Sequence, residues 1–381
     1  MSCSSFNRDP SMTLSFRPSD VLNMSGNLPP KVPHVFDDAY RAAVQHVMSS
    51  CEPSHLIGAH QFRGSERDRA LGARFVGRRM PESPAADRVV VANGTQSILM
   101  MLLAGIVGPN RRLAIEALSY PTVQTFAQHL GFELSPVAMD GEGAVPEALE
   151  AICRTERPAA YYAMPTIQNP TTGTMSVERR KAIAEICRRY EVAIIEDDIY
   201  SLLPKDAPPP LSSFAPEISW YVLGTAKSLS AALKIAYVVA PSAEAAAERF
   251  WPGVRATYWM CAPMNGAIVS SLIETGAVED IIEAVRAETR VRQAMVSESV
   301  SSPDLRSRPD CLHVFLPLPA DRPAKDFVAR VRALGVDVSP ASTYAMNDSP
   351  APNAIRFGTG TPRDRAAFER GLAAITKVYR G

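Results

Sequence analysis

The sequence predicts an α/β protein with a mostly parallel central sheet, helices on both faces of that sheet, and a smaller α+β domain. From about residue 88, short apolar strands alternate with amphipathic helices, a pattern typical of parallel sheets. After Pro263 this alternation gives way to a long helical stretch and then to mixed strands and helices. A length of 381 residues, with 46% hydrophobic and 21% charged residues, suits one large and one small domain that bury a sizeable core.

The elements of the alternating region follow from the local pattern of apolar residues. Each expected strand is a short apolar run. In chain order, the expected strands are Arg88–Ala92, Leu113–Glu116, Ala160–Met164, Val192–Ile195, Tyr221–Leu223 and Ile235–Ala240. Between them lie amphipathic stretches that favour helices. In chain order, the expected helices are Gly94–Val107, Pro121–Leu130, Pro146–Arg154 and Val177–Tyr190.

The C-terminal third is expected to begin with one long helix, because Asn265–Val300 contains no proline. Shorter apolar strands and helices follow it. In chain order, they are His313–Leu318, Ala324–Leu334, Ala354–Phe357 and Arg363–Tyr379. We therefore expect a loose N-terminal arm over 1–20, a large domain over 50–260, and a small domain that combines 21–49 with 261–381.

Composition argues against several classes of protein. Forty basic and forty acidic residues give a formal net charge of +0, so we expect no nucleic-acid partner. The six cysteines form no CxxC pair and no cluster with the histidines, so we expect no metal site and a reducing cytoplasm. We expect no membrane segment, because the longest apolar run, Ile98–Val107, is too short. We expect no secretion signal, because the N-terminus lacks a basic region followed by an apolar stretch. The motifs GxxxxGK[ST], GxSxG and HExxH are absent.

Two motifs with reactive side chains directly follow expected strands. Ile194–Tyr200 leads from an apolar run into three carboxylates and a tyrosine, at the edge where parallel sheets bind ligands. An acidic surface loop is the alternative interpretation. Lys227 follows another apolar run among small residues, and a desolvated lysine near a second cation, such as Lys234, becomes nucleophilic. The alternative interpretation of Lys227 is an ordinary surface lysine.

Two further motifs could bind a polar ligand. In Pro165–Gly173, proline and glycine favour a turn in which Asn169 could offer its amide to a ligand. Asn93–Gln96 joins an expected strand to an expected helix, and the free N–H groups of a helix N-terminus favour a phosphate. A simple turn and a helix cap without a ligand remain the alternatives.

Six motifs then occur in a specific order along the chain. They are NGTQ at Asn93–Gln96, SYP at Ser119–Pro121, QNPTTG at Gln168–Gly173, EDDIY at Glu196–Tyr200, GTAKSL at Gly224–Leu229 and AIRF at Ala354–Phe357. Over residues 22–380, this ordered set resembles the class I/II aminotransferases, which are fold type I pyridoxal-phosphate enzymes. The sequence is most similar to kynurenine/aminoadipate-type transaminases and to the aminotransferase-like domain of MocR-type regulators.

The resemblance implies pyridoxal 5'-phosphate as the cofactor and assigns residues to its ring. Lys227 would form the internal aldimine and shuttle a proton between the substrate and the cofactor. Asp197, rather than the neighbouring aspartate, would pair with the pyridinium nitrogen and keep it protonated. Tyr200 and Asn169 would hold the phenolate oxygen, with Asn169 also next to the substrate, and Tyr120 would stack on the ring.

The resemblance also assigns the charged ends of the ligands. Gly94, Thr95 and Gln96 would bind the phosphate at a helix N-terminus. Lys234 stands where the family usually has an arginine, and it would neutralise the phosphate as a point charge. Arg356 would bind the substrate α-carboxylate with two parallel hydrogen bonds.

Some positions depart from the family pattern. Gly224 and Ala226 stand where serines usually contribute hydroxyls to the phosphate, and Thr225 or Ser228 could replace them. His60 stands where a tyrosine usually reaches the phosphate of the partner subunit. These departures leave the expected cofactor unchanged, but they bear on which bond of the substrate is broken.

The resemblance implies a cytoplasmic homodimeric aminotransferase with active sites at the interface. It would move an amino group between an amino acid and a 2-oxo acid in a ping-pong reaction. Another pyridoxal-phosphate reaction, such as elimination, decarboxylation or oxidation, is an alternative. A cofactor-binding sensor domain is a second alternative, although no helix-turn-helix precedes residue 22.

The substrate is less constrained by the sequence. Ser25–Pro29 is similar to the glycine segment that lies near the substrate in this family, without indicating which residue makes contact. No second arginine stands out for a side-chain carboxylate, which argues against a dedicated aspartate enzyme. Four aromatic residues could line a pocket for a long or aromatic side chain, or belong to the core: Tyr161, Tyr258, Trp259 and Tyr344.

Overall fold

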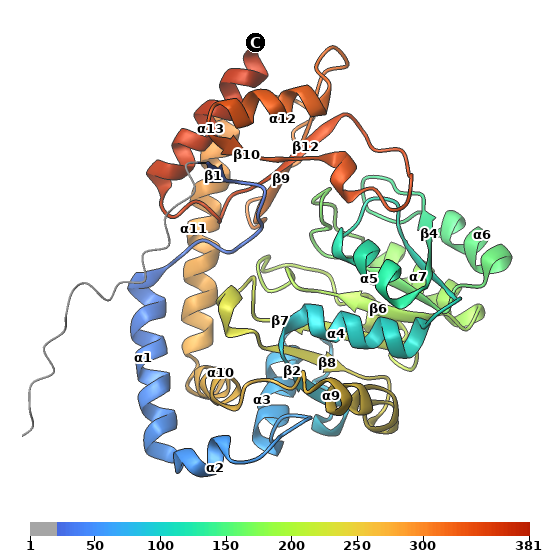
Figure 1. Ribbon diagram of the computed structural model, residues 1–381, viewed down its shortest axis with the longest axis vertical. Coiled ribbons are helices and arrows are strands. Elements are labelled where there is room, and N and C mark those ends of the chain that lie inside the picture. Colours follow the sequence, from blue (N-terminus) through green and yellow to red (C-terminus); the bar gives the residue numbers. More distant parts are fainter. Residues whose placement is uncertain (1–20) are drawn as a thin grey trace, which may run out of the picture.

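The computed structural model describes residues 21–381, so the predicted arm over 1–20 lies outside the described residues. A seven-stranded sheet has the order β2-β8-β7-β6-β5-β3-β4 (Figure 1). Its strands are β2 (Val89–Ala92), β3 (Arg112–Glu116), β4 (Glu133–Val137), β5 (Ala160–Ala163), β6 (Ala193–Asp197), β7 (Ser219–Gly224) and β8 (Ala236–Val239). Only β8 runs antiparallel to its neighbours, which confirms the predicted mostly parallel sheet.

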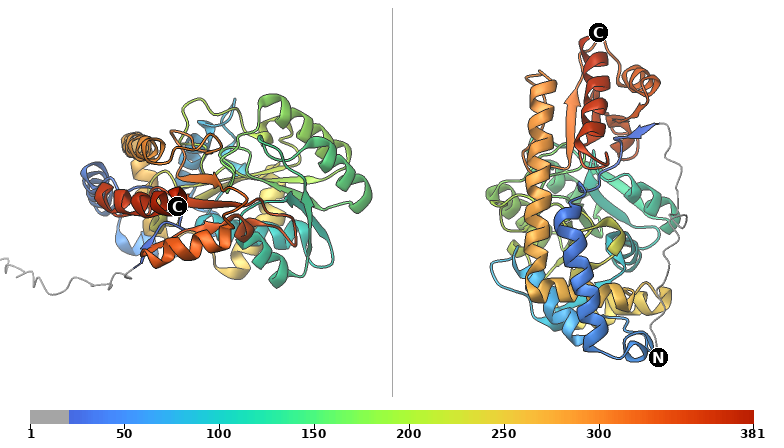
Figure 2. Two further views of the ribbon diagram at one scale, coloured as in Figure 1. Left: turned by 90° about the horizontal axis from the view of Figure 1, so that it is seen from above. Right: turned by 90° about the vertical axis from the view of Figure 1, so that its left-hand side faces the viewer.

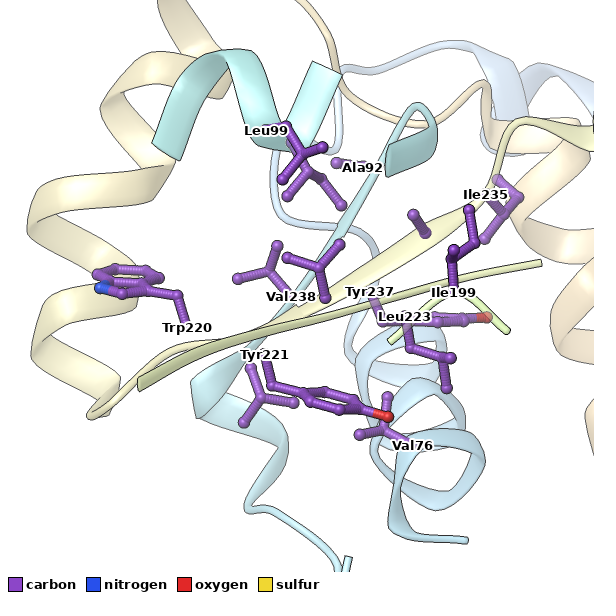
Figure 3. Packing of buried hydrophobic residues seen from close by; sticks show 14 of the residues in the cluster. Val76, Ala92, Leu99, Ile199, Trp220, Tyr221, Leu223, Ile235, Tyr237 and Val238 are labelled. Atoms are coloured by element: carbon purple, nitrogen blue, oxygen red, sulfur yellow. The ribbon is translucent and has the colours of Figure 1, made fainter. Parts of the chain in front are cut away.

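Helices cover both faces of this sheet. They are α3 (Glu66–Gly77), α4 (Gly94–Leu102, extended by a π-helical turn over Leu103–Val107), α5 (Thr122–Leu130), α6 (Pro146–Glu156) and α7 (Val177–Arg189). Neighbouring strand residues point to opposite faces, so Tyr161 of β5 packs with α6 and α7 while Tyr162 packs with the core that includes α4 and α5. Figure 3 shows Leu99 of α4 on one side of β7 and β8, and Val76 of α3 on the other.

The expected single helix over Asn265–Val300 is wrong. This stretch forms two helices, α10 (Pro263–Thr275) and α11 (Ala277–Ser299). Gly276 ends α10 in the left-handed conformation, with φ of 82°, which glycine adopts without steric cost. The chain therefore changes direction at Gly276, and α11 runs from α10 to the C-terminal strands (Figures 1 and 2).

The C-terminal part is the smaller α+β unit that the sequence predicts. Its antiparallel sheet has the order β11 (Ser339–Pro340), β12 (Ala354–Gly358), β9 (His313–Pro317). Helices α12 (Ala324–Ala333) and α13 (Arg365–Arg380) pack beside these strands. The short strand β1 (Leu22–Asn23) pairs in parallel with β10 (Val336–Asp337). The first described residues therefore lie against the C-terminal part of the chain (Figure 1).

Several elements were not anticipated from the sequence. The helices are α1 (Pro33–Ser50), α2 (Pro53–Ile57), α3, α8 (Ala243–Ala245) and α9 (Trp251–Thr257), and the main strand is β4. Helix α3 begins with a capping box, in which Ser65 and Asp68 each accept a hydrogen bond from the backbone N–H of the other. Strand β4 contains Pro136, which is tolerated because β4 lies at the edge of the sheet.

Two of the large hydrophobic clusters connect elements that are far apart in the sequence. One joins the central sheet to α1 through Ala43 and Val47 and to α10 through Ile268. Another gathers Met24 and Phe357 with residues of α11, α12 and α13. The predicted domain boundaries at residues 49 and 261 stay a prediction. Within residues 21–381, no helix combines the length and apolar composition needed to span a bilayer.

Candidate active site

A cavity of about 960 Å³ lies at the carboxyl ends of β5, β6 and β7 and at the N-terminus of α4. Each of the predicted site residues lines it. These residues are Gly94, Thr95, Gln96, Tyr120, Asn169, Asp197, Tyr200, Lys227, Lys234 and Arg356. The carboxyl ends of parallel strands meet at one edge of a sheet, which explains why these dispersed motifs converge. The chemical role of each residue stays a prediction.

The three residues left open as phosphate contacts are not among the residues that line this cavity. Thr225 Oγ1 donates to the backbone oxygen of Ile235 at 2.9 Å. Its hydroxyl therefore links the residue after β7 to the residue before β8. The hydroxyl of Ser228 is buried without a partner in the described chain. His60 stacks on Phe62, with 5.4 Å between the ring centres.

The four aromatic candidates separate into two groups. Trp259 and Tyr344 line the cavity. Tyr161 is fully buried in the core between the sheet, α6 and α7, and Tyr258 is 60% exposed. Tyr161 therefore serves the core, and neither Tyr161 nor Tyr258 forms part of the cavity wall.

The three consecutive carboxylates at the end of β6 have separate partners. Glu196 lies 3.8 Å from the buried guanidinium of Arg180, and Asp198 lies 3.4 Å from that of Arg79. Asp197 lines the cavity between them. Strand residues alternate in direction, which explains why the neighbouring acids pair away from the cavity. Each of the two outer acids is therefore neutralised by an arginine, and only Asp197 faces the cavity.

Asp197 has one satisfied and one free carboxylate oxygen. Its Oδ2 accepts a hydrogen bond from the Tyr162 hydroxyl at 2.9 Å, whereas Oδ1 is buried without a partner in the described chain. Burial raises the pKa of Asp197 to about 6, while the hydrogen bond from Tyr162 opposes this rise. A cationic N–H group at Oδ1 would satisfy the free oxygen and stabilise the ionised carboxylate.

Lys227 extends from the segment after β7 into the cavity. Its amine donates to the backbone oxygen of Asn27 and lies 5.9 Å from the centre of the Tyr200 ring. Burial, and then the positive charge of Arg356, lowers the pKa of Lys227 to about 8, while Asp197 opposes this shift. The amine is therefore uncharged more often than that of a surface lysine, and the uncharged amine is the nucleophile.

One corner of the cavity is suited to an anion. Gly94, with φ of 81°, begins α4, whose N-terminus directs backbone N–H groups toward the cavity. Lys234 packs beside it, since a Cβ placed on Gly94 would lie 3.6 Å from Lys234 Cδ. A Cβ on Gly224 would lie only 2.6 Å from Thr95 Cγ2. The serine usual at position 224 would therefore displace Thr95, whose methyl group occupies that space.

Arg356 of β12 closes the opposite side of the cavity. Its side chain is buried, and Nη1 donates to the backbone oxygen of Ser25 at 2.8 Å and to the hydroxyl of Tyr344 at 3.0 Å. Its Nε is buried without a partner in the described chain. Arg356 therefore retains capacity for a strong acceptor such as a carboxylate.

Several residues that support this site were not anticipated from the sequence. Tyr162, Arg79 and Arg180 contact the three acids, and nothing local in the sequence indicates these pairings. His313 is fully buried, with ring nitrogens 3.1 Å from the Asn27 amide and 3.2 Å from the backbone oxygen of Gln168. Burial and then Arg356 lower the pKa of His313 well below its usual value, so the ring is neutral.

Glu116 is a buried acid behind the cavity wall. Its Oε2 accepts from Gln168 Nε2 at 3.1 Å, and its Oε1 has no partner in the described chain. Burial raises the pKa of Glu116 from 4.5 to about 7, while the hydrogen bond from Gln168 opposes this rise. The pKa is higher in the folded than in the unfolded chain. The carboxylate therefore costs no stability below pH 4.5 and increasingly destabilises the fold as the pH rises toward 7.

Replacing Glu116 by glutamine should stabilise the protein above pH 7, because the amide keeps an acceptor for Gln168 without the buried charge. We expect a gain on the order of 2 kcal/mol at pH 8 and little difference at pH 4.5. Urea unfolding midpoints between pH 4.5 and 8 measure the effect, with the exposed Glu147→Gln as control. Equal midpoints for Glu116→Gln and the unchanged chain at pH 8 would contradict the expectation.

The fold and the cavity define a class of protein. A parallel sheet whose carboxyl edge gathers a lysine, an unpaired aspartate and a helix N-terminus is suited to bind an anionic, ring-shaped cofactor. The family model of aminotransferase class I and II matches residues 19–375, so the chain belongs to this family. The resemblance and the fold class predicted from the sequence are thereby confirmed.

Known relatives include regulators as well as enzymes. Over 297 residues the chain is 29% identical to the uncharacterized HTH-type transcriptional regulator YdeF of Bacillus subtilis, covering 77% of this chain and 63% of that protein. Over 121 residues it is 36% identical to an aromatic amino acid aminotransferase of Schizosaccharomyces pombe, covering 30% of this chain and 25% of that protein. The chain thus spans less than two thirds of the length of these curated relatives.

A solved structure shares the fold over nearly the whole chain. LysN, an α-aminoadipate aminotransferase from Thermus thermophilus, superposes with a TM-score of 0.82 at 22% sequence identity. The superposition covers 95% of this chain and 92% of LysN, which was solved with N-(5'-phosphopyridoxyl)-L-leucine.

Pyridoxal phosphate is the cofactor implied by the family, and the cavity has the groups to bind it. The free Oδ1 of Asp197 offers an acceptor to the protonated ring nitrogen. The α4 N-terminus and Lys234 offer N–H groups and positive charge to the phosphate. The amine of Lys227 lines the same cavity and would be the nucleophile for the aldehyde.

Proposed function

We propose that the chain is a pyridoxal-phosphate-dependent aminotransferase that moves an amino group between an amino acid and a 2-oxo acid. A single observation carries this proposal: the Lys227 amine, the Asp197 carboxylate with its free Oδ1, and the Arg356 guanidinium line the same cavity. When bound, the cofactor supplies an electron sink for the charge left at the substrate Cα. The protein has to bind and orient the cofactor and the substrate, and it has to move protons to and from that carbon.

Each residue has a proposed task that its surroundings support. Asp197 holds the proton on the ring nitrogen, and Tyr162 keeps the carboxylate in place. Tyr200 and Asn169 hold the ring oxygen. Tyr120 stacks on the ring face and receives a hydrogen bond from Gln96 at 2.8 Å.

The charged ends of cofactor and substrate have separate binding groups. The α4 N-terminus, with Gly94, Thr95 and Gln96, binds the phosphate, and Lys234 neutralises it. Arg356 binds the α-carboxylate and so orients the substrate Cα toward Lys227. Lys227 accepts the proton from Cα and returns it to the product, which an amine of pKa about 8 is suited to do near neutral pH.

A homodimer in the cytoplasm forms part of the proposal. Ile57, Tyr258 and Trp259 are exposed large hydrophobic residues, and Trp259 also lines the cavity. A second copy covering these residues would place the active site at the interface between subunits. Analytical ultracentrifugation of the purified chain tests this assembly.

A sensor domain without turnover is the second candidate, because YdeF is named as a transcriptional regulator and matches 77% of this chain. Elimination, decarboxylation and oxidation remain alternative reactions, motivated by Gly224 and Ala226. These alternatives predict different products from the same amino acid, so one set of measurements separates them.

A panel of amino acids incubated with the cofactor-loaded protein tests the function. We expect one or more to diminish the visible absorption of the bound cofactor and to release the matching 2-oxo acid. Ammonia without transfer to an added 2-oxo acid would identify elimination or oxidation instead. Spectral change without turnover, together with cofactor-dependent DNA retardation in a gel, would favour the sensor. Absence of cofactor absorption in the loaded protein would overturn the proposal.

A further inference from the structure

The segment Ser25–Leu28 passes directly over the two groups proposed to bind the substrate. The backbone oxygen of Ser25 accepts from Arg356 Nη1 at 2.8 Å. The backbone oxygen of Asn27 accepts from the amine of Lys227. One short piece of chain thus occupies donors on the proposed carboxylate-binding residue and on the proposed proton-transfer residue.

The side-chain amide of Asn27 supplies a further acceptor to Arg356. When its nitrogen faces the backbone oxygen of Leu312 at 3.1 Å, its oxygen lies 2.6 Å from Arg356 Nη2 and 2.6 Å from the Tyr200 hydroxyl. In this orientation the contacts with Leu312, Arg356 and Tyr200 each join a donor to an acceptor, whereas the reverse would oppose two donors at Arg356. The amide oxygen also lies 3.1 Å from His313 Nδ1, which places the single proton of the neutral ring on Nδ1 and leaves Nε2 without a hydrogen bond to Gln168. Ser25 and Asn27 therefore present one oxygen to each terminal nitrogen of Arg356, as a carboxylate does.

The segment packs closely against the backbone of β12 and the residues that follow it. Gly358 donates its N–H to the oxygen of Met24 at 2.6 Å. A Cβ on Gly358 would lie 1.9 Å from the oxygen of Gly26, and one on Gly360 would lie 2.1 Å from the oxygen of Leu28. Only glycine at these two positions allows this close approach.

We propose that Asn27 is a specificity residue that competes with the α-carboxylate of the substrate for Arg356. This inference rests on the role of Arg356 in the proposed function. A carboxylate binds a guanidinium more strongly than a neutral amide oxygen does. A ligand with a free carboxylate therefore displaces Asn27, whereas a neutral ester or amide of the same shape does not. Asn27 thus makes the site discriminate against uncharged analogues.

Substitutions at residue 27 test the competition, because they should change the affinity for a carboxylate in opposite directions. The probe is 3-phenylpropionate, a carboxylate without an amino group, titrated into the cofactor-loaded protein by calorimetry. We expect Asn27→Ala to bind it about tenfold more tightly, and Asn27→Asp about tenfold more weakly, because the new carboxylate pairs with Arg356. The neutral 3-phenylpropionamide should bind weakly to the unchanged protein and to Asn27→Asp, and more tightly to Asn27→Ala, because no side chain then competes with it for Arg356.

Controls separate competition from a structural role. Asn347→Ala removes an exposed asparagine that does not line the cavity, so its affinity for the probe should stay within about twofold. Thermal unfolding of each variant checks that it is folded. Weaker binding by Asn27→Ala, or no difference between the alanine and aspartate variants, would overturn the inference. The cofactor absorption of the unchanged protein and its reaction with the amino-donor panel are measured separately. These two measurements show whether the proposed function fails, independently of whether Asn27 competes for Arg356.

Discussion

Replacing Lys227 by alanine is expected to abolish amino-group transfer. The variant retains Asp197, Arg356 and the α4 N-terminus, so it loses the nucleophilic and proton-transferring amine without losing the other groups of the cavity. Loss of proton transfer alone is expected to lower the rate about 10²–10⁴-fold, and loss of the covalent attachment adds to this. The visible absorption of the bound cofactor and single-turnover rates with an active amino donor measure the two losses separately.

Two comparisons make this result specific to the amine. Lys205→Ala removes an exposed lysine that pairs with Glu283, and it should leave the absorption and the rate unchanged. Added methylamine should partly restore the rate of Lys227→Ala, because it supplies an amine to the space left by the side chain. Unchanged absorption and turnover in Lys227→Ala would refute the assignment of this residue.

Replacing Arg180 by methionine is expected to cause the largest loss of stability. Arg180 is fully buried, lies 3.8 Å from the buried Glu196 and donates to the backbone oxygens of Met175 and Pro165. Removal of one partner from a buried ion pair leaves an uncompensated charge, which costs about 3–5 kcal/mol. Urea and thermal unfolding midpoints should fall accordingly.

The matched variants report what the charge contributes. Glu196→Gln combined with Arg180→Met removes both charges and should recover part of the loss, leaving the cost of the broken backbone contacts. Arg188→Ala removes an exposed arginine that contacts Glu217, and its effect should stay within about 1 kcal/mol. Equal midpoints for Arg180→Met and Arg188→Ala would show that Glu196 tolerates burial without its partner.

Much of the fold was predictable because its signals are local. Apolar runs identified the strands from β2 to β8 apart from the edge strand β4, where Pro136 interrupts the pattern. Amphipathic spacing identified α4 to α7 and, near the C-terminus, α12 and α13. The expectation of one helix over Asn265–Val300 was wrong because apolar residues continue on both sides of Gly276, while the glycine itself ends the first helix.

The candidate site was predictable only as a set of positions. Motif order identified Lys227, Asp197 and Arg356, and the parallel sheet explains why they converge. Thr95 illustrates what stayed hidden, because its methyl group fills the space beside Gly224, a contact between two separate motifs. Asn27 is another example, since its contact with Arg356 joins opposite ends of the chain.

By itself, the sequence determined the order of most strands and helices and the cofactor, and it predicted the residues of the site, because these depend on short-range pattern and on motifs. Only the tertiary structure decided which cation neutralises each acid of β6, which Asp197 oxygen stays free, and which segment covers Arg356. The physical reason is that such contacts join residues far apart along the chain. Ser25 and Arg356 are separated by 331 positions and are brought together by strand pairing and close glycine packing, not by any local preference.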